Sequence, residues 1–359
     1  MTIRIDQFHT TVSDGASIGG QILNLQQMLR GLGYQSEIFC EQPPLHFSGQ
    51  TRQMREYNQL ASAKDVLLAH FSLNYSHAVV DWLKTLPSRK VMIYHNITPP
   101  HYFVGVNDIF LEAAQMGQQQ LGEMVDLFEA GWGDSIFNAQ DLAAHGWTRS
   151  GVLPIIFNPD RLNARRPDQK ILKRWHGGVN VLFVGRVSPN KRFEDVILTF
   201  YDLKRFVCPE ARLCLVGSAG GMERYLDFLQ TLVERLGLTD VIFTGHIGAS
   251  QCLAYYQCAS VYVSMSEHEG FGIPFLESMH FGLPIIAYKA AAIPETLADS
   301  GLLVTQKNYA AIAELIGLLI EDEALRAKIV TRQRERLQDF LPSKIENQLR
   351  QLLYNLDVL

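Results

Sequence analysis

Short apolar runs recur along the second half of the chain, and each is almost continuous in Val, Ile and Leu. Such runs are typical of strands buried on both faces of a parallel sheet. The segment after the first run has helical periodicity, with Phe193, Val196 and Phe200 on one face. Strands and helices that alternate in this way predict βαβ units and a doubly wound α/β sheet. The predicted strands are 181–185, 213–217, 241–245, 261–265 and 284–288.

The first half of the chain repeats this pattern less regularly. An amphipathic helix, apolar on one face from Ile18 to Leu32, follows the first strand candidate, and Gly31 and Gly33 signal its end. We therefore expect this half to be Rossmann-like as well. Its strand candidates are 3–8, 36–40, 66–71, 90–95 and 135–138.

The two halves are joined by a segment, 157–170, that is rich in Pro, Arg and Asp and has no apolar period, as is typical of a linker. At 359 residues the chain is also longer than one hydrophobic core usually supports. We expect one domain over 1–160, a second domain over 161–340, and a last helix over 341–359 that packs back toward the first domain. Two Rossmann-like doubly wound domains facing across a cleft would bind a ligand beyond the carboxyl ends of their strands.

Composition and charge narrow the classes of protein. The chain is 47% hydrophobic and 19% charged, and its formal net charge of −5 disfavours nucleic acid as a partner. The five cysteines form no C-x-x-C pair and are spaced too widely for a zinc knuckle, which indicates reduced thiols and no zinc. We see no signal-peptide core at the N-terminus and no apolar run of about 18 residues, the length that spans a membrane. We expect a cytoplasmic protein and leave a peripheral contact with the inner membrane open.

A segment with several glycines, 13–20, follows the first predicted strand. Gly15, Gly19 and Gly20 would let backbone amides approach a ligand closely, and a helix start offers a positive dipole end to an anion. The segment differs from G-x-G-x-x-G, and no acidic residue stands at the ribose-reading position, which disfavours NAD. The alternative is a helix start in which the glycines serve packing alone.

Two cations, Arg186 and Lys191, flank a Ser-Pro-Asn turn directly after the strand at 181–185. A guanidinium and an ammonium group on a turn at the carboxyl end of a strand are suited to hold a diphosphate. The alternative is a pair of solvated surface charges.

His95 ends the strand at 90–95, shortly before regular structure stops at Pro99 and Pro100. This position lies at the edge where ligands bind to a doubly wound domain. Asn96 and His101 are weaker candidates. The alternative is a structural histidine.

Two glutamates, Glu269 and Glu277, flank a glycine-containing turn between the strand at 261–265 and a helix that begins near Pro274. Their carboxylates could accept hydrogen bonds from sugar hydroxyls, while amides at the helix start could donate to phosphate oxygens. Alternatively, a carboxylate only caps the helix. The amides concerned are those of Phe271, Gly272 and Ile273.

Together these four features resemble the retaining glycosyltransferases of family 4, which have the two-domain GT-B fold. The resemblance covers nearly the whole chain, and it implies that 1–160 is the acceptor-side domain and 161–340 the nucleotide-sugar-binding domain. Its most specific part is a Glu-x7-Glu signature, E-G-F-G-I-P-F-L-E, followed by the G-x-P-I-I-A strand and the A-A-x-P-E loop. Among these enzymes the chain is most similar to bacterial ones that build cell-surface polysaccharide such as lipopolysaccharide.

The resemblance implies a role for the residues that surround the reacting phosphate. Backbone amides of Gly19 and Gly20 would lie near the donor diphosphate. Arg186 and Lys191 would neutralise the diphosphate as it leaves. His95 would lie beside the transferred sugar.

The resemblance also implies how the rest of the donor is held. Glu269 and the amides of Phe271, Gly272 and Ile273 would bind the transferred sugar, and Glu277 would accept hydrogen bonds from the ribose hydroxyls. The nucleoside would lie along the segment 244–248, with its base near His246 and Ile247.

The implied reaction is transfer of a hexose from a nucleotide diphosphate sugar to a glycan or lipid-linked acceptor, with retention of anomeric configuration. Cations and amides would stabilise the charge that builds on the leaving phosphate, which would itself take the acceptor's proton. The resemblance favours mannose from GDP-mannose over UDP-glucose or another GDP-sugar. The acidic trio at 321–323 has no strand-end setting, so we expect a metal-independent enzyme without a cofactor.

Other functions stay open at this point. An epimerase or a phosphorylase of the same fold is one alternative, and the ribose position of Glu277 disfavours the phosphorylase. A non-catalytic nucleotide-sugar-binding protein is another, which the presence of both glutamates, both cations and His95 disfavours. The acceptor is not identified, because 45–60 and 100–135 have no decisive motif and the segment around Trp132 departs from the apolar strand expected there.

Overall fold

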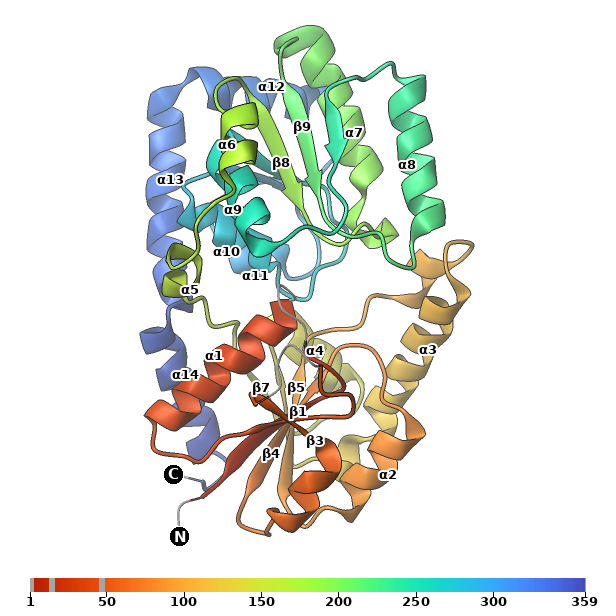
Figure 1. Ribbon diagram of the computed structural model, residues 1–359, viewed down its shortest axis with the longest axis vertical. Coiled ribbons are helices and arrows are strands. Elements are labelled where there is room, and N and C mark those ends of the chain that lie inside the picture. Colours follow the sequence, from red (N-terminus) through yellow and green to blue (C-terminus); the bar gives the residue numbers. More distant parts are fainter. Residues whose placement is uncertain (1–2, 13–16, 45–48, 359) are drawn as a thin grey trace. The chain divides into compact units, whose positions relative to one another are not determined.

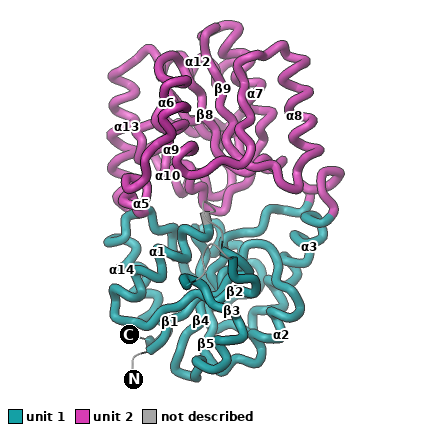
Figure 2. The backbone as a smooth tube through the Cα atoms, viewed as in Figure 1, with its two compact units in different colours: residues 1–100, 109–157, 340–359 teal, residues 101–108, 158–339 magenta. Residues whose placement is uncertain are grey.

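The structure is a computed structural model, and by their contacts its residues divide into two compact units, each an α/β unit with one parallel sheet (Figures 1 and 2). The described residues are 3–12, 17–44 and 49–358. Unit 1 consists of residues 1–100, 109–157 and 340–359, and unit 2 of residues 101–108 and 158–339.

In the described part of unit 1, seven strands form a parallel sheet with the order β3-β2-β1-β4-β5-β6-β7. The chain builds outward from β1 in one direction and then from β4 in the other, so the order reverses between these two strands. The strands are β1 Ile5–His9, β2 Ile38–Cys40, β3 Thr51–Gln53, β4 Val66–Phe71, β5 Arg89–Tyr94, β6 Ala130–Gly133 and β7 Ser150–Val152.

Helices α1 and α14 cover one face of this sheet. Their apolar side chains recur at a spacing of three or four residues, and they pack with β1, β4, β5 and β6 in one core, which includes Leu25 and Leu29 of α1 and Ile345, Leu349 and Leu353 of α14. The helices of unit 1 are α1 Ser17–Gly31, α2 His77–Thr85, α3 Asp108–Glu123, α4 Ile136–Ala144 and α14 Pro342–Tyr354, with short 3-10 helices at Met54–Gln59 and Val125–Leu127. Two more 3-10 helices, Pro100–Phe103 and Gln338–Phe340, lie where the chain passes between the two units.

Unit 2, all of whose residues are described, has a parallel sheet of six strands in the order β10-β9-β8-β11-β12-β13. Here the order reverses between β8 and β11. In open α/β sheets such a switch point is where ligands bind, beyond the carboxyl ends of the strands. The strands are β8 Asn180–Val184, β9 Arg212–Val216, β10 Val241–Phe243, β11 Val261–Ser264, β12 Ile285–Tyr288 and β13 Leu302–Val304.

The helices of unit 2 pack in pairs, α7 with α12, α6 with α9, and α10 with α13. None of the helices in the described part of the chain is long and apolar enough to span a bilayer. The helices are α5 Pro159–Asn163, α6 Gln169–Trp175, α7 Phe193–Asp202, α8 Glu223–Arg235, α9 Ala249–Cys258, α10 Ile273–His280, α11 Ile293–Leu297, α12 Tyr309–Glu321 and α13 Glu323–Leu337, with short turns of helix at Pro189–Lys191 and Leu203–Val207.

The prediction of two doubly wound parallel sheets is confirmed, but one predicted strand is wrong. Residues 135–138 begin helix α4, because the Ser135 side chain accepts a hydrogen bond from the Asn138 amide and caps the helix. The strand is β6, whose glycines hide it from an apolar pattern. At Gly133 a Cβ atom would lie 2.7 Å from the Asn138 Cβ, so the close approach of α4 requires glycine there. The predicted linker 157–170 is also not purely irregular, since it contains α5 and the start of α6.

Candidate functional site

The loops after β8 and β11 flank the switch point of the unit 2 sheet, and an ion pair joins them. Lys191 Nζ lies 2.5 Å from Glu269 Oε2, and the two side chains are 19% and 12% exposed. These residues are far apart in the sequence, and the fold brings them together because β8 and β11 are neighbouring strands. A cation and a carboxylate thus meet where an open α/β sheet binds its ligand.

Asn190 fastens the same two loops to each other through its backbone and its side chain. The Glu267 amide donates to the Asn190 carbonyl at 2.9 Å, and Asn190 Nδ2 donates to the His268 carbonyl at 3.0 Å. Asn190 is buried. We assigned it no role from the sequence, although an Asn in a turn is a signal of such local hydrogen bonding.

A second network of ion pairs involves residues that are close in the sequence to Lys191 and Glu269. Arg192, in the left-handed region with φ of 53°, pairs with Asp195 and Glu267. Lys307 Nζ lies 2.6 Å from a carboxylate oxygen of each of these two acids, and the Tyr309 hydroxyl donates to Asp195. Burial alone would raise the pKa of Asp195, but the hydrogen bonds from Lys307 and Tyr309 outweigh it and lower that pKa. This network fixes the segment that carries Lys191.

Arg186, the other predicted phosphate ligand, points elsewhere in this structure. It follows β8 directly, and its Nη2 donates to the Gly220 carbonyl, in the loop after β9, at 3.0 Å. Its side chain is exposed. The structure therefore joins Lys191 with Glu269 but does not place Arg186 in that pair.

The turn before α10 is built around Gly272. This residue is the N-cap of α10 with φ of 94°, and a Cβ atom there would lie 2.5 Å from the Phe275 ring, so the position requires glycine. Pro274 stands in the first turn of the helix, as predicted. Gly272 has no side chain that could cap this turn, which leaves the helix start suited to an external acceptor.

The A-A-x-P-E segment, 291–295, and the next residue, Thr296, form hydrogen bonds with the backbone of this turn. The Thr296 hydroxyl donates to the Phe271 carbonyl at 2.6 Å, and the Ala292 amide donates to the Glu269 carbonyl at 3.2 Å. The loop thus holds in place the backbone from which the Glu269 side chain extends.

Glu277 lies inside α10, and its carboxylate has a different partner from that of Glu269. Its Oε2 accepts a hydrogen bond of 2.6 Å from the hydroxyl of Tyr256, a buried residue that we did not predict. Burial raises the pKa of Glu277 more than this hydrogen bond lowers it. Burial also raises the pKa of Tyr262, and the negative charges of both carboxylates add to that effect.

His246 and Ile247 lie in the loop between β10 and α9, and the His246 side chain is exposed. Close backbone approach marks this edge of the sheet. A Cβ atom at Gly217, after β9, would lie 1.8 Å from the Gly185 carbonyl oxygen, so only glycine fits there. Gly217 also bridges to Gly245 in the loop that carries His246.

The remaining predicted residues lie in unit 1, apart from His101, which begins the short part of unit 2 at 101–108. Gly19 and Gly20 are in the first turn of α1 rather than in a loop before it, which corrects the prediction, and Gly15 lies outside the described residues. His95 follows β5, and its side chain is 3% exposed. Asn96 is buried and donates to Asn138 at 2.9 Å, whereas His101 is exposed in a 3-10 helix.

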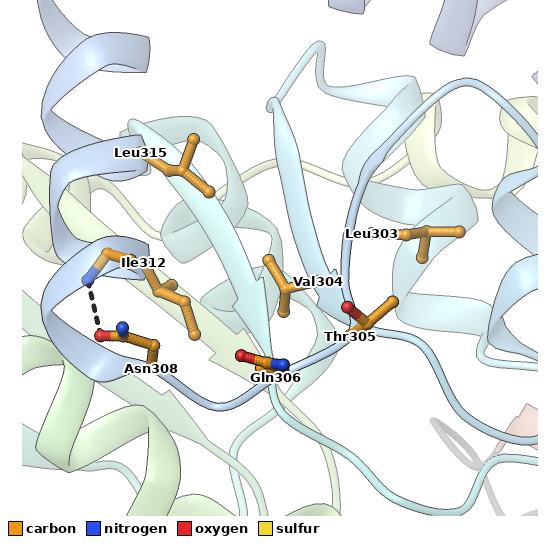
Figure 3. Close-up of a pocket in the computed structure, with 8 residues that line it drawn as sticks. Leu303, Val304, Thr305, Gln306, Asn308, Ile312 and Leu315 are labelled. Carbon is orange, nitrogen blue, oxygen red and sulfur yellow. Dashed lines mark hydrogen bonds between the residues drawn. The ribbon is translucent and has the colours of Figure 1, made fainter.

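A cavity of about 320 Å³ lies between β13 and the first turns of α12 (Figure 3). Apolar side chains such as Leu303, Val304 and Ile312 line much of it, and Asn308 uses its side chain to cap α12. None of the predicted site residues lines this cavity. Among the residues that the structure describes, no group of three or more His, Cys, Asp or Glu side chains is arranged to hold a metal ion.

Part of the chain matches a known protein family. Residues 165–336 match the family described as glycosyl transferases group 1. This segment contains every unit 2 residue of the predicted site. The match lies entirely within unit 2. All of unit 1, including α14, lies outside it.

Three curated relatives of the chain have names that describe glycosyltransferases. A D-inositol 3-phosphate glycosyltransferase of Streptomyces avermitilis is 29% identical over 231 residues, 60% of this chain and 49% of that protein. A GDP-mannose-dependent alpha-(1-6)-phosphatidylinositol monomannoside mannosyltransferase of Mycolicibacterium smegmatis is 31% identical over 47% of each chain. An O-antigen chain mannosyltransferase B of Escherichia coli is 28% identical over 44% of this chain and 40% of that one. The chain matches about half the length of these relatives.

Solved structures show the same fold over almost the entire chain. Anabaena HepE in complex with UDP and glucose has a TM-score of 0.76 at 18% identity, covering 98% of this chain and 100% of that one. The sucrose-phosphate synthase of Thermosynechococcus elongatus has a TM-score of 0.75 at 18% identity, covering 99% of each chain. With the two parallel sheets, these similarities confirm the predicted fold of two Rossmann-like domains, GT-B.

Proposed function

We propose that this protein is a glycosyltransferase that moves a hexose from a nucleotide diphosphate sugar to a glycan or lipid-linked acceptor. The observation that carries the proposal is the Lys191–Glu269 ion pair at the switch point of the unit 2 sheet, beside the uncapped start of α10. The match of 165–336 to glycosyl transferases group 1 supports it.

In this proposal the ion pair is the resting state of the donor site. A donor diphosphate takes the place of Glu269 as the partner of Lys191, because a phosphate carries more negative charge than a carboxylate. Glu269 is then free to accept hydrogen bonds from hydroxyls of the hexose. The amides of Phe271, Gly272 and Ile273 donate to the same end of the donor. Arg186 turns from the Gly220 carbonyl toward the diphosphate.

The other end of the donor is assigned to Glu277 and the loop after β10. Tyr256 occupies Oε2 of Glu277, which leaves Oε1 to accept from the ribose hydroxyls. His246 and Ile247 lie along the base. In unit 1, Gly19, Gly20 and His95 are assigned to the diphosphate and the transferred sugar.

We assign a retaining mechanism that needs no metal ion. Cations and amides stabilise the negative charge on the leaving phosphate, and removing one such donor typically costs about 2.7–4 kcal/mol of transition-state stabilisation. The leaving phosphate takes the proton of the acceptor hydroxyl on the face of the sugar that it departs from. The chain itself then needs no nucleophile.

We propose GDP-mannose as the donor and cell-surface polysaccharide, such as lipopolysaccharide, as the destination of the mannose. The names of two relatives support this choice, since one acts on an O-antigen chain and both are mannosyltransferases. A peripheral contact with the inner membrane fits a lipid-linked acceptor.

Thermal unfolding in the presence of GDP, UDP, ADP or dTDP tests the donor site. A ligand that binds only the folded protein stabilises it, by about 2.7 kcal/mol at a concentration of 100 Kd. We expect GDP to raise the melting temperature of the wild type and to lose this effect in Lys191→Ala. A wild-type protein that none of the four nucleotides stabilises would overturn the proposal.

A further inference from the structure

Four adjacent strands of the unit 1 sheet change from apolar to polar side chains at the same edge. On the face that α1 and α14 cover, each strand carries apolar residues of the common core before this edge. Partners in register, and residues two positions apart in one strand, point to the same side of a sheet. The next residue on this face therefore lies two positions further along each strand, and it is polar in every case. The pairs of last apolar and first polar residue are Ile5 and Gln7, Leu68 and His70, Ile93 and His95, and Trp132 and Asp134.

These four polar side chains form one continuous row of hydrogen bonds. Gln7 Oε1 and His70 Nε2 are 2.9 Å apart, as are His70 Nδ1 and His95 Nε2, and His95 Nδ1 lies 2.7 Å from Asp134 Oδ2. The planes of the two imidazole rings differ by only 6°. Gln7 and His70 are completely buried, and the side chains of His95 and Asp134 are 3% and 4% exposed.

The direction of these hydrogen bonds follows from Gln7. Its Nε2 donates to the Ile22 carbonyl at 3.0 Å, so its Oε1 faces His70 and can only accept. His70 therefore carries its proton on Nε2. An uncharged His70 then presents a lone pair on Nδ1, and the contact with His95 needs a proton on His95 Nε2.

The opposite assignment is disfavoured by the surroundings of His70. A proton on both of its nitrogens would place a charge at a completely buried ring with no carboxylate in hydrogen-bond contact. Burial lowers the pKa of His70 far below its ordinary value, and the neighbouring rings of His95 and His9 lower it further. Burial also lowers the pKa of His9, to about 4.

We propose that Gln7 and His70 are positioning residues that hold a proton on Nε2 of His95, so that His95 is a hydrogen-bond donor and cannot serve as a base. Asp134 Oδ2 accepts a hydrogen bond from Nδ1 of the same ring, so both nitrogens of His95 carry a proton in this row. The row has a feature that folding alone does not explain. Asp134 Oδ1 is buried and has no hydrogen-bond partner among the described residues.

The protonation of His95 bears on where the proton of the acceptor hydroxyl goes, a consequence that rests on the proposed function. If His95 cannot accept a proton, the proton of the acceptor hydroxyl goes to the leaving phosphate. A glutamine at position 95 can donate from its amide nitrogen at the position of Nε2, but it can act neither as a base nor as a cation.

Nitrogen-15 NMR of the histidine rings in the full-length protein tests the protonation state without any sugar. We expect His95 Nε2 to be protonated in the wild type and His70 Nδ1 to be unprotonated. In Gln7→Leu the His70 Nε2 proton loses its acceptor, so it moves to Nδ1, and His95 Nε2 becomes the acceptor. Gln26→Leu, which removes the hydrogen bond from another buried glutamine to Ser36, is the control and leaves His95 unchanged.

A second pair of variants keeps the test decisive if Gln7→Leu does not fold. His70→Asn offers an amide oxygen near the position of Nδ1 and retains the proton on His95 Nε2, whereas His70→Leu removes the acceptor. An unprotonated Nε2 in the wild type, or a ring that does not respond to Gln7→Leu or to His70→Leu, overturns the inference. Neither result bears on the donor site of unit 2, so failure here differs from failure of the proposed function.

Turnover of GDP-mannose then tests the consequence for the reaction. Only the glutamine keeps a donor at the position of Nε2. We therefore expect His95→Gln to release GDP at least about tenfold faster than His95→Leu, whereas the loss of a general base, which typically costs 10²–10⁴-fold, would affect both variants equally. Equal loss in the two variants contradicts the donor role of His95.

Discussion

Unit 2 places its charged groups in loops beyond the ends of its strands, whereas unit 1 places two polar groups on strands and two directly after strands. In unit 2, Lys191 and Glu269 form an ion pair that remains partly exposed. In unit 1, the row from Gln7 to Asp134 is almost completely buried. The same type of sheet thus carries a partly exposed ion pair in one unit and a buried row of polar side chains in the other.

The largest effect is expected from closing the edge of the unit 2 sheet at Gly217. A Cβ atom there would lie 1.8 Å from the backbone oxygen of Gly185. The backbone fixes the position of the alanine Cβ, so Gly217→Ala cannot avoid the clash without moving the backbone. We expect it to lower the free energy of unfolding of unit 2 by at least about 3 kcal/mol. Urea unfolding followed by circular dichroism measures this.

Gly237→Ala is the matched control for this variant. Gly237 has φ of 65° and open space around it, so alanine costs only the left-handed conformation, about 1–2 kcal/mol. If the two variants are equally stable, close backbone approach does not shape this edge of the sheet.

The next largest effect is expected from breaking the Lys191–Glu269 ion pair, compared with breaking an ion pair elsewhere in unit 2. We expect Lys191→Ala and Glu269→Ala each to slow release of GDP from GDP-mannose by about 10²–10³-fold, as the loss of one charge-stabilising group does. Lys204→Ala is the control, because Lys204 pairs with Asp240 at 2.7 Å in the same unit but away from the switch point. Equal losses in Lys191→Ala and Lys204→Ala would show that the position of the pair is irrelevant.

A smaller effect is expected from the second network of ion pairs. Lys307→Met removes a hydrogen bond to Asp195, whose side chain is 2% exposed, and we expect a loss of about 2 kcal/mol in the free energy of unfolding. Lys84→Met, which breaks an exposed pair with Asp81 in unit 1, should cost less than about 1 kcal/mol.

The pH dependence of this loss gives a second readout. The pKa of Asp195 is lower in the folded protein than its ordinary value of 3.8, so its contribution to stability is complete above 3.8 and is lost as pH falls through the folded pKa. Urea midpoints at pH 5 and pH 3 should therefore differ more in the wild type than in Lys307→Met. A larger difference in the variant would contradict the assigned role of Lys307.

The smallest effect is expected at Glu277. Its pKa is higher in the folded protein than its ordinary value of 4.5, so the stability that the protonated form gives is complete below 4.5 and is lost as pH rises through the folded pKa. Glu277→Gln removes that loss, and we expect a gain on the order of 1 kcal/mol or less at pH 7, with the hydrogen bond from Tyr256 retained. Thermal unfolding at pH 4 and pH 7 measures it, and a clear destabilisation at pH 7 would refute the assignment.

Much of unit 2 could be predicted because its strands are continuous apolar runs and its turns carry Gly and Pro. Gly272 and Pro274 mark the start of α10 in the sequence as they do in the structure. In contrast, β6 of unit 1 was missed because Gly131 and Gly133 make room for Trp147 and for α4, and that packing is not visible along the chain.

The candidate site divides in the same way. Lys191 and Glu269 could be singled out because each stands in a turn directly after an apolar strand. The orientation of Arg186 toward Gly220 could not, because it depends on the loop after β9. Of the row in unit 1 only His95 was predicted. His70 and Asp134 follow alternating apolar residues in the sequence, but their meeting depends on the register of four strands.

The most direct test of the central claim is transfer of radiolabelled mannose from GDP-mannose to a lipid-linked saccharide fraction. We expect labelled mannose in the acceptor with its anomeric configuration retained, one GDP released for each mannose transferred, and loss of both in Lys191→Ala but not in Lys204→Ala. Release of an epimerised sugar nucleotide without any transfer would contradict the account.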